Sequence, residues 1–253
     1  MPGRVAVRTL YGTRVKDLLE NILKQLPGYL PNLASLVTRP KTAILRWVGE
    51  AAGDLTRPLT FVGVSVAIGF LLQLPQLGKE DVFTTLVASM AVFKVLALVM
   101  FAGIIQLVFR MAGGHAGFSE TFSAYLYIVS PLYIAGIILE IARLGILRAY
   151  DPATAMATRV NPDYLVANTD RWRTFQVAAP GLAVAYVVLG LATIFVFLGW
   201  FVACWGAFRH LHGIARWRSA FAGVATLAAG VVFFSVLQYV LLGMFGARVP
   251  PLH

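Results

Sequence analysis

The chain has 253 residues, of which 59% are hydrophobic and 13% are charged, and its mean hydropathy is +0.78. A water-soluble fold of this length could not bury so much apolar surface, so the composition excludes an ordinary globular protein and favours an integral membrane protein. The net charge of +10 does not indicate a nucleic-acid-binding protein, because lysine and arginine flank the apolar segments, next to membrane lipids.

Residues 1–57 are expected to form a cytosolic arm of amphipathic helices, because the first apolar segment starts only after Pro58. Residues 14–26 carry valine, leucine and isoleucine at the spacing of one helical face. A further helix is expected after Pro40. Trp47 lies among cationic residues in that helix, which suits the headgroup layer of a membrane.

Five apolar segments are expected to cross the membrane as helices. They occupy about residues 59–74, 82–109, 121–141, 177–208 and 219–245. The fourth segment is long enough for one helix or for two helices broken near Gly199. The predicted fold is therefore an all-α polytopic transmembrane helix bundle over residues 58–246, followed by a short C-terminal tail at 247–253.

Small residues and one proline are expected to shape these spans. Two pairs in the first span recur at a spacing that lets helices approach closely: Gly63 with Ala67, and Ser65 with Gly69. Pro131 in the third span lacks a backbone N–H, so it is expected to kink the helix.

Lysine and arginine are more numerous beside the spans on the side of the N-terminus than on the opposite side. This asymmetry predicts that the N-terminus is cytosolic and that the C-terminus is periplasmic. The connections after the second and fourth spans then face the cytosol. The hydrophilic connection at 143–176 faces outward, and its arginines are accompanied by several aspartates.

Three short stretches carry a resemblance to a known family. Residues 113–122 read GGHAGFSETF and are followed by Tyr125 and Pro131, residues 211–220 read LHGIARWRSA, and residues 36–42 read LVTRPKT. These stretches, together with the five expected spans, resemble the bacterial branch of the Yip domain family, the Rab/Ypt-interacting membrane proteins. The resemblance covers roughly residues 30–245.

The resemblance implies an integral membrane protein with a cytosolic N-terminus. Eukaryotic members of the family bind Rab-type GTPases and act in vesicle traffic. That role is not carried over to this chain, because its sequence neither shows nor excludes a vesicle system. For the bacterial members the resemblance implies no settled biochemical activity.

Lys94 lies near the middle of the second apolar segment, where burying an ammonium group costs a few kcal/mol. It either faces a bundle interior or an aqueous cavity, or it snorkels to the outer interface from a tilted helix. Glu140 is its candidate acidic partner. However, Arg143 lies one turn beyond Glu140, so an ion pair of Glu140 with Arg143 is the expected arrangement.

His115, His210 and His212 are all expected on the cytosolic face, where three imidazoles could hold a zinc ion or ligate a haem. No carboxylate stands near to orient them, and His210 and His212 point away from each other on a helix end. The sequence therefore favours no metal site and no cofactor.

The spans carry no motif of a hydrolase or a metalloprotease and no paired acidic residues, so the chain is not expected to be an enzyme. Gly113, Gly114 and Gly117 lack the strand and the lysine of a phosphate loop, and we expect them to permit a tight turn and close packing. An anion site remains an alternative at this turn, because Arg110 precedes it and a helix starts after it.

The sequence thus predicts a non-enzymatic interaction or organising protein, or an accessory subunit, in a bacterial cytoplasmic membrane. Its arm and its cytosolic turns would contact a second copy of the chain or a partner membrane protein. The alternative is a transporter or lipid-handling protein that uses Lys94 and kinks at Pro131 and Pro180 around a midplane cavity. No internal repeat supports the alternative.

Overall fold

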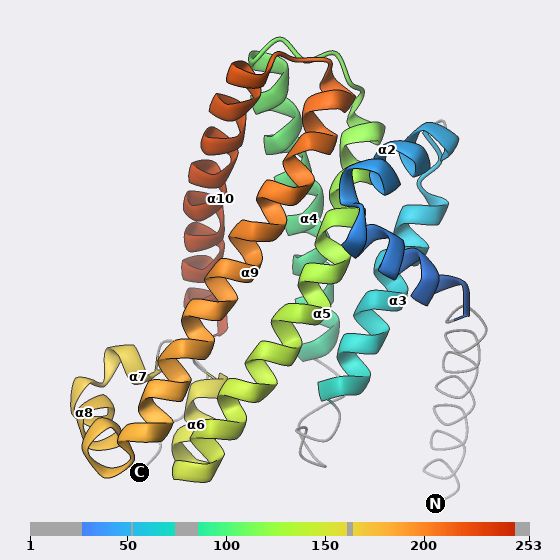
Figure 1. Cartoon of the computed structure of the whole chain (residues 1–253). Coiled ribbons are helices and arrows are strands. Elements are labelled where there is room, and N and C mark those ends of the chain that lie inside the picture. Colours follow the sequence, from blue (N-terminus) through green and yellow to red (C-terminus); the bar gives the residue numbers. More distant parts are fainter. Residues whose placement is uncertain (1–26, 52, 74–85, 161–163, 246–253) are drawn as a thin grey trace, which may run out of the picture. The chain divides into compact units, whose positions relative to one another are not determined.

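The computed structural model describes residues 27–51, 53–73, 86–160 and 164–245. Within these ranges the regular secondary structure is helical and contains no strand, which confirms the predicted all-α class (Figure 1). The amphipathic helix expected at 14–26 and the tail expected at 247–253 lie outside the described residues.

Four of the described helices are long and apolar enough to cross a membrane. They are α3 (Thr56–Gln73), α5 (Phe118–Tyr150), α9 (Pro180–His212) and α10 (Arg216–Phe245). α4 (Leu86–Met111) has 26 residues and, at about 1.5 Å per residue, is also longer than the hydrocarbon core of a bilayer. Its side chains are described only from Leu96 onward, and this shorter part is apolar. The chain is a helical membrane protein, with α4 as the candidate for a fifth span.

Two helices have bounds that hydropathy did not indicate. α5 continues past residue 141 to Tyr150, because the charged residues there are good helix formers and do not end a helix. The apolar segment expected at 177–208 is interrupted at Ala179, where Pro180 begins α9 as a first-turn proline. α9 then runs unbroken through Gly199, since one glycine costs a helix only about 1 kcal/mol.

The chain divides into two compact units, which are described separately. The first unit comprises Met1–Arg39, Leu59–Leu77 and Tyr127–Ala203. The second unit comprises Pro40–Pro58, Gly78–Leu126 and Cys204–His253.

In the first unit, the hydrophilic connection forms a small packed helical assembly. Its helices are α6 (Pro152–Val160), α7 (Tyr164–Ala167) and α8 (Thr169–Ala178). Phe175 and Leu147 are fully buried in a core that also includes Tyr186 from the start of α9. The Arg143 guanidinium lies 4.4 Å from the centre of the Tyr186 ring and donates a 2.7 Å hydrogen bond to its hydroxyl. The connection is therefore an ordered cap with its own apolar core.

Asp151 begins α6 as an N-cap residue. Its carboxylate accepts hydrogen bonds from the Thr154 hydroxyl at 2.6 Å and from the backbone N–H groups of Ala153 and Thr154. The hydrogen bond from the Thr154 hydroxyl contributes most to lowering the pKa of Asp151 below its usual value. Pro152 follows at the first helical position, where its missing N–H is not needed.

In the second unit, α2 (Pro40–Ala51) buries one apolar face, as its amphipathic pattern predicted. Trp47 was expected at the headgroup layer, but it is only 1% exposed. The Arg57 guanidinium covers its ring at 5.5 Å from the ring centre, and Glu50 holds Arg57 through a 2.9 Å ion pair. The indole is therefore packed within the protein, because neighbouring arginine side chains complete its environment.

Only one of the two small-residue pairs in α3 forms a close helix contact. Ser65 is fully buried, and its hydroxyl lies 2.8 Å from that of Tyr29. At Gly69 an added Cβ would lie 2.6 Å from the Tyr133 ring and 2.4 Å from the end of Ile137, so α3 and α5 approach each other at this glycine. At Gly63 an added Cβ would meet no atom within 4 Å.

Replacing Gly69 with alanine should therefore destabilise the protein by about 1–3 kcal/mol, because the Tyr133 ring must move to admit a methyl group. The measurement is the midpoint of thermal unfolding of the detergent-purified chain. Gly63→Ala is the matched control in the same helix and should leave the midpoint unchanged or slightly raised. Equal midpoints for the two variants would contradict the contact.

Candidate functional site

The C-terminus of α4 ends in a Schellman motif. Gly113 has a φ of 92°, in the left-handed region that favours glycine. Its N–H donates to the Arg110 carbonyl at 2.9 Å, and the N–H of Gly114 donates to the Phe109 carbonyl at 2.9 Å. This pair of bonds satisfies the last helical carbonyls and reverses the chain direction sharply. Gly113 and Gly114 therefore end α4 in a tight turn.

The C-terminus of α9 ends in the same way. Gly213 has a φ of 65°, and its N–H donates to the His210 carbonyl at 3.2 Å. The N–H of Ile214 donates to the Arg209 carbonyl at 3.2 Å. Ile214 is buried, which supplies the hydrophobic contact that accompanies this motif.

These two glycine turns lie against each other in the second unit. The His115 N–H donates to the His212 carbonyl at 3.2 Å, so the loop after α4 is tied to the last residue of α9. A Cβ at Gly113 would lie 3.3 Å from a guanidinium nitrogen of Arg218 on α10. The structure therefore brings together residues 113–122 and 211–220, which are far apart in the sequence.

A buried chain of hydrogen bonds joins the helices behind the turns. The Gln106 amide donates from Nε2 to the Ala116 carbonyl at 2.7 Å. The Thr121 hydroxyl donates to Gln106 Oε1 and lies 3.1 Å from His212 Nε2. Gln106, Thr121 and His212 are at most 8% exposed, so α4, α5 and α9 share a polar contact that is shielded from water.

The direction of these bonds fixes the tautomer of His212. Because Gln106 donates through Nε2, its Oε1 is the acceptor for the single hydroxyl hydrogen of Thr121. Thr121 then accepts a hydrogen bond from His212, whose proton must sit on Nε2. The unprotonated Nδ1 is buried without a hydrogen-bond partner and faces Gly114, where a Cβ would lie 2.6 Å away.

Gly117 begins α5 as its N-cap residue. Its carbonyl accepts the N–H of Thr121 at 3.1 Å, and its own N–H donates to Glu120 Oε2 at 2.8 Å. This is the glutamate half of a capping box, with a carboxylate placed favourably at the positive end of the helix dipole. The first turn of α5 thereby fixes Thr121 opposite His212.

The three histidines singled out in the sequence lie in different surroundings. Of the three, His212 is buried, whereas His115 and His210 are exposed, and His210 lies 3.0 Å from the Arg209 guanidinium. In the part of the chain that the structure describes, no three histidine, cysteine, aspartate or glutamate side chains gather where they could hold a metal ion. The contact between His115 and His212 does agree with the expectation that both lie on one face of the membrane.

Glu140 and Arg143, two of the charged residues singled out in the spans, belong to the first unit and not to this cluster. The side chain of Lys94 lies outside the described residues, so its depth and its role in a transporter remain predictions. Arg143 contacts Tyr186, and the ion pairs found among the described side chains join Glu50 to Arg46 and Arg57. The expected pair of Glu140 with Arg143 is not among them, because Tyr186 offers Arg143 both a ring face and a hydroxyl. Pro131 lies inside α5, which continues on both sides of it.

Gln106 and Thr121 were not predicted as site residues. Gln106 follows two isoleucines in an apolar helix, and an uncharged polar side chain in a span is itself a signal for a hydrogen bond between helices. Thr121 lies in the stretch 113–122, but the sequence predicted no role for its side chain. The sequence offered no way to pair either residue with His212, which follows Thr121 by 91 positions.

Replacing Gly114 with alanine tests the packing of the turns. The methyl group would meet His212 at 2.6 Å and the Phe109 carbonyl at 2.8 Å, and a backbone oxygen cannot swing aside. We expect a loss of about 1–3 kcal/mol in the free energy of unfolding, measured by denaturant titration in detergent. Gly145→Ala in α5, where no atom lies within 4 Å of the added methyl, should cost nothing. A Gly114→Ala variant as stable as the control would refute the close contact.

The chain was compared with protein-family models, curated proteins and solved structures. No curated protein and no solved structure gives a significant match to the chain. The family model described as Yip1 domain matches residues 34–237, which is well over half of the chain and includes both glycine turns. The chain therefore belongs to the Yip1 domain family of membrane proteins.

Proposed function

We propose that this chain is a non-enzymatic organising protein of a bacterial cytoplasmic membrane, which associates with itself or with a partner membrane protein. The proposal rests on the contact between the two glycine turns. The hydrogen bonds of His212, Thr121 and Gln106 give two loops and three helices one fixed surface, as a recognition surface requires.

The side chains around this surface suit contact with another protein. Met111 is 80% exposed at the end of α4, Trp217 is 63% exposed at the start of α10, and Phe118 is 43% exposed at the start of α5. Exposed methionine and aromatic side chains are common in protein interfaces. We call the exposed residues Met111, His115, Phe118 and Trp217 the turn surface.

The spans also leave apolar surface for association within the membrane. Only 6% of the most apolar stretch of α9 is buried within the protein, compared with 50% for α5. Gly190 and Gly199 of α9 have no atom within 4 Å of an added Cβ, so they leave room for a neighbouring helix. Lipid tails or a second copy can occupy this side of α9.

The cytosolic placement of the turn surface is supported by charge. Arg110, Arg209, Arg216 and Arg218 cluster at the two turns, and cytoplasmic connections are rich in arginine and lysine. This placement gives a cytosolic N-terminus and a periplasmic C-terminus for a chain with five spans.

Light scattering of the chain purified in mild detergent tests the proposal. We expect a mass larger than one chain, either as an oligomer or as a stoichiometric complex with a partner membrane protein. Met111→Asp together with His115→Asp should reduce that mass to one chain, because two carboxylates would oppose association at the turn surface. Met156→Asp is the matched control, since Met156 is an exposed methionine on α6.

A monodisperse monomer of the unaltered chain, without a partner, would overturn the proposal. So would a complex that persists unchanged in the Met111→Asp, His115→Asp variant.

A further inference from the structure

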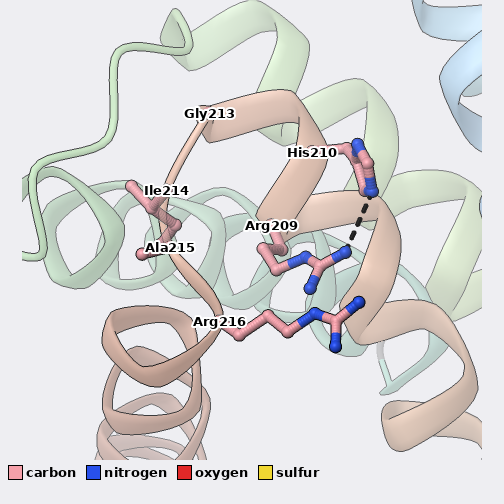
Figure 2. Close-up of a pocket in the computed structure, with 6 residues that line it drawn as sticks. All are labelled: Arg209, His210, Gly213, Ile214, Ala215 and Arg216. Atoms are coloured by element: carbon pink, nitrogen blue, oxygen red, sulfur yellow. Dashed lines mark hydrogen bonds between the residues drawn. The ribbon is translucent and has the colours of Figure 1, made fainter.

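The turn between α9 and α10 carries a shallow, open pocket whose lining residues include two arginines. The pocket has a volume of about 280 Å³ and is lined by Arg209, His210, Gly213, Ile214, Ala215 and Arg216. Figure 2 shows the guanidinium groups of Arg209 and Arg216 extending to the same side of the turn, with the imidazole of His210 beside Arg209. None of the lining residues is acidic.

A third cation approaches from α2. The Cδ atom of Lys41 lies 3.3 Å from the position that a Cβ at Gly206 would occupy. Gly206 precedes His210 by one helical turn on the same face of α9. The aliphatic part of Lys41 therefore lies along α9, and Lys41 is close enough to act electrostatically on His210.

No carboxylate among the described residues forms an ion pair with these cations, Lys41, Arg209 and Arg216, since the ion pairs there involve Glu50. Holding several positive charges together without an opposing charge is unfavourable. A bound anion would remove this cost.

The N-terminus of α10 also favours a bound anion. Its N-cap residue is Ala215, whose side chain cannot accept the free N–H groups of the first turn. The first turn contains no acidic residue but contains Arg216 and Arg218, although the helix dipole favours negative charge at this end. Arg218 is already placed against the α4 turn and on Trp217, so Arg216 is the cation left for a ligand in the pocket.

We propose that this pocket binds a phosphate group, with Arg209 and Arg216 as its two guanidinium ligands, Lys41 as a supporting cation and His210 as a neutral imidazole that accepts a hydrogen bond from Arg209. A guanidinium donates two parallel N–H groups that match two phosphate oxygens, which a single lysine cannot do. The phosphate belongs to a phospholipid headgroup or to a small soluble phosphate ester. Trp217, exposed next to Arg216, suits the interfacial depth at which lipid headgroups lie.

The experiment measures lipid binding to the full chain in detergent by native mass spectrometry. Phosphatidylglycerol should bind at least about tenfold more tightly than phosphatidylcholine, which equals about 1.4 kcal/mol. The Arg209→Gln, Arg216→Gln double variant should lose this preference. The matched control is Arg171→Gln, Arg173→Gln on α8, which removes the same charge from two exposed arginines and should keep the preference.

A second experiment distinguishes a phospholipid headgroup from a soluble phosphate ester. Glycerol 3-phosphate binding is measured by calorimetry on the same variants. Binding of phosphatidylglycerol that depends on Arg209 and Arg216 assigns a lipid, whereas binding of glycerol 3-phosphate alone with the same dependence assigns a soluble ester; either result supports the site.

Equal binding of both probes to the unaltered chain and to the double variant would overturn the site. So would an equal loss in the α8 control, which would show that net charge alone attracts the probes. If the double variant unfolds at a lower temperature, Arg216→Gln alone serves instead, because Arg216 is exposed and its removal leaves the helix packing intact. Unchanged binding in that variant would also overturn the site.

Discussion

The hydrogen bond between Thr121 and His212 is the interaction on which the arrangement of the second unit depends. Both residues are fully buried, so neither can exchange its protein partner for water without opening the packing. Thr121 is placed by the capped first turn of α5, His212 is the last residue of α9, and Gln106 extends the chain of bonds to α4. The hydrogen bonds of this buried network form in one register of the three helices and therefore specify it, although Nδ1 of His212 has no hydrogen-bond partner.

This constraint explains why two distant stretches of the sequence both need glycine at their turns. Gly113 and Gly213 are needed because each takes a positive φ in a helix stop, whereas Gly114 is needed because His212 and the Phe109 carbonyl leave no room for a Cβ. The same stops end α4 and α9 beside each other and project basic and exposed apolar side chains outward. The surface that we propose for association and the phosphate pocket thus both depend on the same backbone geometry.

The sequence predicted the helical membrane class and the role of the glycines, because apolar length and glycine chemistry are local properties. It did not predict the ordered cap formed by α6, α7 and α8, since its core depends on Phe175 meeting Leu147 and Tyr186. It also overlooked Gln106 and Thr121, because local patterns do not show which residues of separate helices will pair. Lys94 attracted attention as the charge in an apolar segment, whereas the buried hydrogen bonds that join α4, α5 and α9 are made by uncharged side chains.

A double-mutant cycle on the unfolding free energy tests the central claim most directly. Thr121→Val and His212→Phe each remove one side of the hydrogen bond while approximately preserving side-chain volume, and the cycle isolates their mutual contribution. If Thr121 and His212 hold the turns together, their coupling energy in detergent should be about 1 kcal/mol. Additive effects, with a coupling within about 0.3 kcal/mol of zero, would contradict the account.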